Sequence, residues 1–304
     1  MARYYDSMRE LVGNTPLVRL HNVGAPEDVR LFAKLELWNP AGSVKDRTGV
    51  FMVEQAEKEG LLAPGSTIVE GTAGNMGLGI AFAAIGKGYH VGFAVPEKVS
   101  QEKQTLTRAR RAKTVNPTHA AGMLGAAAKA EQLLSEIPNS IALRQFKNQA
   151  NPEAHYRTTG PEIWDDLDGD IDYFVAGAGS GGTYTGVARY LKSRRPGIRG
   201  ILADPVGSTM GGGEHGDYDI EGIGNDFVAD TMDMGLVDDV IKVNDGQAYE
   251  GSRLLARAEG IIAGSSSGAA LAASLELADR VRTGTIVTVF PDRGDRYFSK
   301  NLYA

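Results

Sequence analysis

One lysine of this chain stands where its amine could act as a nucleophile. The stretch 39–47 reads Asn-Pro-Ala-Gly-Ser-Val-Lys-Asp-Arg, and its proline and glycine indicate a turn before a helix. Ser43 with Asp46 three residues later fits a capping box, which puts Lys45 in the first helical turn. The positive end of the helix dipole disfavours a cation there, so we expect a lowered pKa and an amine that attacks a carbonyl. A solvated lysine at a helix start is the alternative.

A second stretch is suited to a phosphate group. Residues 177–183 read Gly-Ala-Gly-Ser-Gly-Gly-Thr between a predicted strand and a predicted helix, where free N–H groups and hydroxyls bind anions. No Lys or Arg lies between Phe174 and Val187, so the backbone would carry the charge of a dianion. The stretch also satisfies G-x-G-x-x-G, with Asp204 about twenty residues later. An NAD-dependent oxidoreductase therefore remains an alternative.

Two more glycine-rich stretches precede predicted helices. Residues 70–77 read Glu-Gly-Thr-Ala-Gly-Asn-Met-Gly, and their N–H groups would suit a carboxylate or a phosphate. Residues 264–268 read Gly-Ser-Ser-Ser-Gly. The first stretch is equally consistent with a turn that packs a helix on a sheet. The second, taken alone, favours a simple serine cap.

Composition narrows the class of protein. The 304 residues are enough for one large or two moderate domains, and the net charge of −6 argues against a nucleic-acid or anionic-membrane partner. There are no cysteines, which excludes thiolate nucleophiles and Cys-ligated metals, and the five histidines are isolated, so we predict no metal. The first residues lack the apolar core of a signal peptide, and the longest apolar stretch, 78–86, is too short to span a membrane. We expect a cytoplasmic enzyme.

The elements that must position these stretches alternate along the chain. Strands are predicted at 17–20, 30–35, 67–70, 90–95, 114–115, 141–143, 173–176, 201–204, 240–243 and 285–290. Helices are predicted at 45–59, 76–87, 100–110, 120–136, 152–166, 182–193, 247–258 and 267–280. This alternation predicts an α/β fold with mainly parallel sheets covered by helices on both faces. A domain boundary is expected in the polar stretch 145–150.

Taken in order, these stretches resemble the cysteine synthase and cystathionine β-synthase family of pyridoxal-phosphate enzymes. The resemblance covers nearly the whole chain and rests on 13–17, 34–36, 39–47, 72–75, 145–152, 159–164, 179–183, 221–224 and 264–268. Residues 117–118 with 122–123, 137–140 and 290–297 look closest to the bacterial O-acetylserine-dependent cystathionine β-synthase branch. The chain departs from the family pattern at Gly71, Ala73 and Met76, and Arg110-Arg111 stand where a Leu-Gly pair is common.

The resemblance implies a role for each candidate that would meet the cofactor, pyridoxal 5′-phosphate. Lys45 would form the Schiff base with its aldehyde, and Asn75 would hydrogen-bond the 3′-oxygen of its ring. Ser266, with Ser267 as the register alternative, would meet the pyridine nitrogen. The phosphate would be held by Gly179, Ser180, Gly181, Gly182 and Thr183.

The resemblance also implies how substrates would bind. The substrate carboxylate would be held by Thr72, Ala73, Gly74 and Gln145. Glu221 would lie at the mouth of the site and receive the ammonium group of homocysteine, although a solvated loop glutamate is equally consistent with its position.

The implied fold is that of tryptophan synthase β, also called fold type II. We expect two domains, 1–145 and 146–304. The first residues, to about 35, could pack on the second domain. The implied enzyme is a homodimer that replaces the β-substituent of O-acetylserine or serine by a thiol, through an aminoacrylate. Homocysteine would give cystathionine, and sulfide would give cysteine. A catalytically idle relative that serves as a binding partner is a further alternative.

Overall fold

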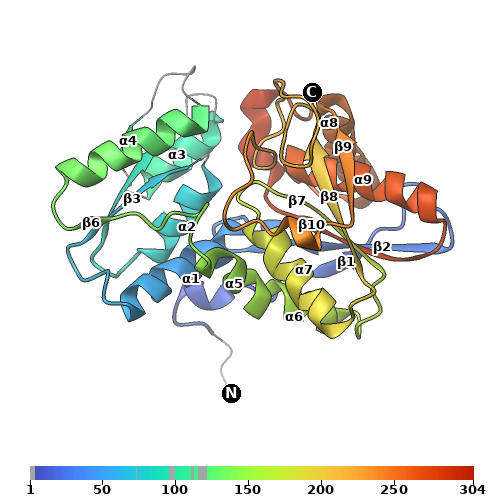
Figure 1. Ribbon diagram of the computed structural model, residues 1–304, viewed down its shortest axis with the longest axis horizontal. Helices are drawn as coiled ribbons and strands as arrows, with labels where there is room; N and C mark the ends of the chain where they lie inside the picture. Colours follow the sequence, from blue (N-terminus) through green and yellow to red (C-terminus); the bar gives the residue numbers. More distant parts are fainter. Residues whose placement is uncertain (1–3, 73, 96–99, 111–112, 116–121) are drawn as a thin grey trace.

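Two β-sheets organise the chain, and each is built mainly from parallel strands (Figure 1). The computed structural model describes residues 4–72, 74–95, 100–110, 113–115 and 122–304. The larger sheet has the order β1 (Leu17–Arg19), β2 (Val29–Leu35), β10 (Gly284–Phe290), β7 (Tyr173–Gly177), β8 (Arg199–Pro205) and β9 (Asp239–Val243). The smaller sheet has the order β5 (Lys113–Val115), β4 (His90–Ala94), β3 (Thr67–Gly71) and β6 (Ser140–Ile141). Only the β1–β2 pair is antiparallel among the described strand pairs.

Helices cover both sheets, as parallel strands require. Those near the smaller sheet are α1 (Lys45–Lys58), α2 (Asn75–Ala83), α3 (Gln101–Ala109) and α4 (Gly122–Glu136). Those near the larger sheet are α5 (Ala150–Arg157), α6 (Thr159–Asp166), α7 (Gly182–Arg194), α8 (Asp245–Leu254) and α9 (Ser265–Val281). The short helical turns are Met8–Leu11, Glu36–Trp38, Met234–Leu236, Leu255–Glu259 and Gly294–Lys300. No helix in the described part of the chain is long and apolar enough to cross a membrane.

The position of β10 explains why its sequence is a continuous apolar run. This strand pairs in parallel with β2 on one side and β7 on the other, and residues 285–290 are all buried. Apolar side chains are needed on both faces of such a strand, because α8 and α9 pack on one face of the sheet and α6 and α7 on the other. The chain thus brings β1 and β2, from its first residues, beside strands that lie after residue 173.

Helix α2 is apolar on every side, which is typical of a fully buried helix. It crosses α1 at a point where both helices carry glycine. A Cβ atom on Gly49 would lie 2.4 Å from the carbonyl carbon of Gly79, and one on Gly79 would lie 2.2 Å from the Lys45 carbonyl oxygen. Only glycine allows this approach, and it places the middle of α2, at Gly79, against the turn that carries Lys45.

The predicted α/β class with mainly parallel sheets is confirmed, and three local predictions are wrong. The helix predicted at 152–166 is two helices, because Thr158 leaves helical geometry (φ −126°, ψ −71°). The helix predicted at 247–258 ends at Leu254 and continues as a wider π turn. The capping box does not form, since Val44 is the N-cap residue and Asp46 instead accepts the Ala41 N–H at 2.5 Å.

Candidate active site

A cavity of about 510 Å³ lies between segments that are far apart in the sequence. Its walls come from the start of α1, the loop after β3, the loop between β7 and α7, the stretch 217–225 and the start of α9. The predicted site residues in its lining are Lys45, Thr72, Asn75, Gln145, Gly179, Ser180, Gly181, Thr183, Glu221 and Ser266. Gly74 and Gly182 flank lining residues, and Ala73 lies outside the described residues.

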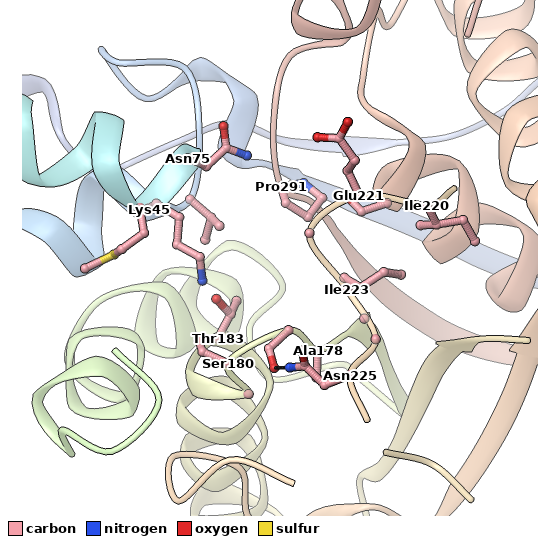
Figure 2. Close-up of a pocket in the computed structure, with 18 of the residues that line it drawn as sticks. Lys45, Asn75, Ala178, Ser180, Thr183, Ile220, Glu221, Ile223, Asn225 and Pro291 are labelled. Atoms are coloured by element: carbon pink, nitrogen blue, oxygen red, sulfur yellow. Dashed lines mark hydrogen bonds between the residues drawn. The ribbon is translucent and has the colours of Figure 1, made fainter. Parts of the chain in front are cut away.

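Lys45 is the first residue of α1, as the sequence predicts. Its side chain extends toward Ser180 and Thr183 across the cavity (Figure 2). Burial lowers the pKa of its ammonium group to about 8. The predicted direction of the shift is therefore confirmed, and desolvation by burial is its cause in the structure. An amine with this pKa is partly neutral near neutral pH, which a nucleophile requires.

The loop after β7 presents N–H groups to the same cavity. The first N–H groups of an α-helix have no partner inside the helix, and in α7 these belong to Gly181–Tyr184. Gly181 has a φ of +83°, and a Cβ atom there would lie 2.4 Å from the Cβ of Met232. Only a glycine is tolerated at this position, so the loop is closely packed from behind and open toward the cavity. An anion with several oxygens fits this arrangement.

A buried histidine supports one end of this loop. His155 Nε2 lies 3.0 Å from Thr48 Oγ1 and 3.2 Å from Thr183 Oγ1, while Nδ1 lies 2.9 Å from Thr159 Oγ1. Burial, with the nearby positive charges of Lys45 and Arg47, holds its pKa well below the ordinary value. A neutral imidazole therefore links α1 to the first turn of α7. The sequence contained no signal for this role, because the three threonines lie in three separate segments.

Asn75 begins α2 and faces the cavity, but both ends of its amide have protein partners. Nδ2 donates to Asp292 Oδ2 at 2.7 Å, and Oδ1 accepts from Arg296 at 2.5 Å. The side chain is therefore held in place by the C-terminal segment. Its contact with a ring oxygen stays a prediction.

Thr72 makes hydrogen bonds within the segment from the end of β3 to the first turn of α2. Its hydroxyl accepts N–H bonds from Gly74 and Gly77, both at 3.2 Å. Gln145 faces the same loop, since its Nε2 donates to the Gly71 carbonyl at 3.4 Å. These contacts bring the predicted carboxylate-binding residues Thr72, Gly74 and Gln145 together.

Two serines at the start of α9 are candidates for the contact with the ring nitrogen, and only one of them lines the cavity. Ser266 lines the cavity, whereas Ser267 is fully buried, does not line it, and has a hydroxyl without a partner in the described part of the chain. The helical turn points neighbouring side chains in different directions, so only one serine can face the cavity. The structure places Ser266 there.

Glu221 lies in the cavity wall, but its carboxylate already has a cation beside it. Lys103 Nζ of α3 donates to Glu221 Oε2 at 2.7 Å and to the Tyr297 hydroxyl at 2.8 Å. The Lys300 ammonium lies 3.8 Å from Glu221 Oε1, which has no hydrogen-bond partner among the described atoms. Glu221 Oε1 is itself buried, so in this structure the carboxylate lies between two lysine ammonium groups. Lys103, which the sequence analysis missed, joins α3 to the segments on the opposite wall.

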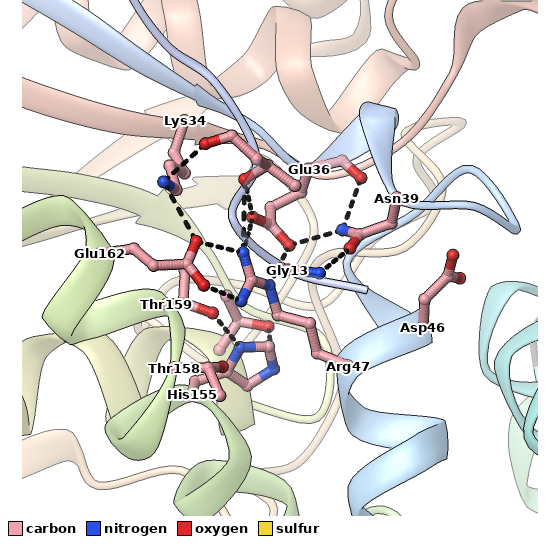
Figure 3. Close-up of polar contacts among 12 residues, drawn as sticks. Gly13, Lys34, Glu36, Asn39, Asp46, Arg47, His155, Thr158, Thr159 and Glu162 are labelled. Carbon is pink, nitrogen blue, oxygen red and sulfur yellow. Dashed lines mark hydrogen bonds and ion pairs between the residues drawn. The ribbon is translucent and has the colours of Figure 1, made fainter. Parts of the chain in front are cut away.

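A cluster of buried charges lies beneath the Lys45 turn (Figure 3). Arg47 donates to Glu36 at 2.7 and 2.8 Å and to Glu162 at 2.6 Å from each of two nitrogens. Burial opposes the ionisation of Glu36, but the Arg47 charge and its hydrogen bonds outweigh burial and hold the Glu36 pKa below its ordinary value. This bidentate pairing ties the start of α1 to α6 and so fixes the position of Lys45.

Glu70, at the end of β3, is a further residue that the sequence analysis did not single out as functional. Its carboxylate accepts the N–H groups of Leu143, Arg144 and Gln145, each at 3.0 Å. Burial raises its pKa although these three donors oppose the shift. Glu70 thereby sets the backbone that carries Gln145.

We predict that Glu70→Gln lowers the free energy of unfolding by about 2 kcal/mol, because the new NH₂ group faces N–H donors and leaves one unsatisfied. Urea titration of the purified protein measures this change. Glu27→Gln, which neutralises an exposed loop carboxylate, is the matched control and should unfold like the unsubstituted protein. Equal unfolding free energies for both variants would contradict the role of Glu70.

The environment of Asp204 weighs against a dinucleotide site. Its Oδ2 accepts from Lys242 at 2.6 Å and from the Gly211 N–H at 3.0 Å, and the residue is fully buried. Asp204 is also absent from the lining of the cavity, so this buried side chain does not face a ribose hydroxyl there. The oxidoreductase alternative loses its second sequence signal.

Comparisons with known proteins agree with this geometry. The family model described as "Pyridoxal-phosphate dependent enzyme" matches residues 8–292. The chain is 48% identical to the O-acetylserine dependent cystathionine beta-synthase of Bacillus subtilis (strain 168), covering 97% of this chain and 96% of the relative. It is 43% identical to the cysteine synthase of Staphylococcus aureus (strain N315), covering 98% and 97% respectively.

Solved structures give the same result for the fold. The O-acetylserine dependent cystathionine beta-synthase from Helicobacter pylori superposes with a TM-score of 0.96 at 40% identity, covering all of both chains. A hydrogen sulfide-producing enzyme from Fusobacterium nucleatum superposes with a TM-score of 0.94 at 34% identity, covering 97% of this chain and 100% of the other.

Proposed function

The chain belongs to the pyridoxal-phosphate dependent enzyme family, and from this premise we propose that it makes cystathionine or cysteine by β-replacement on O-acetylserine. Its fold is the type II fold of that family, and its cofactor is pyridoxal 5′-phosphate. The observation that carries the proposal is the position of Lys45, whose amine of lowered pKa extends toward the glycine-rich loop at the start of α7.

The residues of the cavity fit this cofactor. A phosphate group would be held by the N–H groups of Gly181–Tyr184 and by the Ser180 and Thr183 hydroxyls, with no Lys or Arg between Phe174 and Val187. Lys45 is within the same cavity for attachment of an aldehyde, and Ser266 would face the ring nitrogen. Asn75 would meet the ring oxygen.

When bound, the cofactor supplies an aldehyde that binds amines and a ring that stabilises negative charge at the substrate Cα. Lys45 would accept the α-proton at Nζ as acetate leaves Cβ, and would return that proton to Cα after the thiolate has added at Cβ. Thr72, Gly74 and Gln145 would hold the substrate carboxylate during these transfers. Ala73 is assigned to the same loop from the sequence alone.

The donor preference follows from the leaving group. Acetate leaves Cβ more readily than hydroxide, which needs a proton as it departs. No histidine lies among the described residues that line the cavity, and His155 is engaged by three threonine hydroxyls. A serine hydroxyl at the ring nitrogen, unlike a carboxylate, also leaves the ring a weak electron sink. We therefore expect O-acetylserine to exceed serine as the donor.

Product analysis tests this function. Purified holoenzyme is supplied with O-acetylserine or serine and with homocysteine or sulfide, and cystathionine and cysteine are quantified under steady-state conditions. We expect both products from O-acetylserine and slower formation from serine. Faster turnover of serine would contradict the leaving-group argument, and absence of both products would contradict the proposed function.

Glu221 provides a separate prediction about the nucleophile. The Glu221 carboxylate would receive the ammonium group of homocysteine, whereas sulfide carries no ammonium group. Glu221→Gln should lower cystathionine formation relative to cysteine formation by about tenfold. The measured quantity is the ratio of the two rates from O-acetylserine. Glu214→Gln, a charge loss at an exposed residue outside the cavity lining, is the control, and an unchanged ratio in Glu221→Gln would remove this role.

We also propose a homodimer that works in the cytoplasm. Tyr4, Tyr5 and Met8 near the N-terminus and Trp38 are all more than half exposed, and apolar side chains of this size are typical of an interface. The proposed domain division remains 1–145 and 146–304, with the opening residues through β2 packed on the second domain, since β1 and β2 extend the larger sheet.

A further inference from the structure

A second cavity of about 220 Å³ shares no lining residue with the cavity that holds Lys45. Its walls come from the turn before α1, from the end of α3 and from the C-terminal segment. The lining residues with charged side chains are Arg110, Arg293, Asp295 and Arg296. Among the described residues, three guanidinium groups thus surround a small space together with a single carboxylate.

The single carboxylate is already used. Arg293 donates to Asp295 from Nε at 3.0 Å and from a terminal nitrogen at 2.5 Å, so these two charges cancel. Arg110 and Arg296 have only neutral acceptors among the hydrogen bonds of the described chain. Arg110 donates to the Leu106 carbonyl at 3.3 Å, and Arg296 donates to Asn75 Oδ1 and to the Ala41 carbonyl. Two positive charges at this cavity therefore lack a direct counter-ion.

These two guanidinium groups also repel each other. Burial, and then the charge of Arg296, lower the pKa of Arg110. Arg296 is 3% exposed, so solvent screens the repulsion poorly. An arrangement of this kind is costly for the protein alone and becomes favourable when an anion lies between the two groups.

The carboxyl group of Asp46 compensates part of the positive charge of Arg110 and Arg296. Burial raises its pKa to about 7, against the opposing effects of the Ala41 N–H and of Arg296 and Arg110. One of its oxygens is buried without any hydrogen-bond partner in the described part of the chain, and Figure 3 shows the side chain apart from the Arg47 cluster. At neutral pH only part of the population is therefore charged, and Asp46 offsets the two positive charges only in part.

We propose that this cavity binds a small tetrahedral oxyanion, of the phosphate and sulfate class, between Arg110 and Arg296. Guanidinium groups present paired N–H donors that match the oxygens of such anions, and the cavity has room for an ion of this size. Arg296 connects this cavity to the Lys45 cavity through Asn75.

The test is titration calorimetry of the holoenzyme with sodium phosphate and with sodium sulfate, at ionic strength held constant with chloride. In the holoenzyme the cofactor phosphate would occupy the proposed loop at α7, so added oxyanions would not bind there. We expect both oxyanions to bind, and Arg110→Leu to weaken their affinity by at least about tenfold. Arg108→Leu is the matched control, because Arg108 is an exposed arginine of the same helix and does not line the cavity. The Arg108→Leu protein should bind both oxyanions with the affinity of the unsubstituted protein.

Thermal unfolding distinguishes binding from a structural role. Phosphate should raise the melting temperature of the unsubstituted protein and of Arg108→Leu, but not that of Arg110→Leu. In chloride alone, Arg110→Leu should melt no lower than the unsubstituted protein, because one of two repelling charges has gone. Equal phosphate affinity in all three proteins, or binding of neither oxyanion, would overturn the proposal. If Arg110→Leu does not fold, Arg110→Gln takes its place with the same expected results.

Discussion

Lys45→Ala is expected to lower turnover by at least about 1,000-fold while leaving the fold intact. Lys45 is the proposed attachment point of the cofactor and the proposed acceptor of the α-proton, so its loss would remove both functions. The measurements are steady-state rates with O-acetylserine and either acceptor, together with the visible absorption of the purified protein. Lys58→Ala, at the exposed opposite end of α1, is the control and should retain full activity.

Chemical labelling tests the same assignment without a substitution. Borohydride reduces the link between a lysine and the cofactor, and peptide mapping then identifies the lysine. We expect the label on Lys45. Lys103 is the informative competitor, because it lines the same cavity but is held by Glu221 and Tyr297. A label on Lys103, or retained turnover in Lys45→Ala, would refute the role of Lys45.

Gly181→Asp is expected to weaken cofactor retention by at least about 100-fold. The backbone of Gly181 has positive φ, a new Cβ would overlap Met232, and the added carboxylate would repel a phosphate dianion. Cofactor content per chain after dialysis, and the dissociation constant of the reconstituted apoenzyme, measure the loss.

Two further variants separate the causes. Gly197→Asp adds the same charge at an exposed glycine with open space around it and should retain the cofactor fully. Gly181→Ala keeps the steric overlap without the charge and should give an intermediate loss. Circular dichroism of each apoprotein establishes that the variants are folded. Normal cofactor content in folded Gly181→Asp would rule out the loop as the phosphate site.

The sequence alone predicted those features that depend on neighbours within a few residues. The spacing of hydrophobic residues predicts the strands and helices, and nearly all those predicted exist. The reason is that their hydrogen bonds are mostly local or join continuous apolar runs. The positions of Lys45 at the start of α1 and of Gly177–Thr183 before α7 follow from turn residues next to each element. The α/β class and the family follow from the order of these motifs.

Tertiary structure decided which of the local alternatives occurs. Ser266 and Ser267 have the same local sequence environment, and only the packing of α9 places the first of them in the cavity. Ser43 and Asp46 have the spacing of a cap, but Asp46 turns to the Ala41 N–H because burial removes the solvent that would otherwise bind its carboxylate. The pKa of Lys45 is lowered by the same burial, which a sequence pattern does not contain.

The polar networks around the cavity depend on tertiary structure entirely. Lys103 meets Glu221 across 118 residues and Tyr297 across 194, and Arg296 meets Asn75 across 221. Hydrophobic period and turn chemistry act over a few residues, so they carry no information about such pairs. The pairs form because the parallel sheets and their crossover helices bring distant loops to one cavity. A buried charge there requires a partner, and the fold decides which segment supplies it.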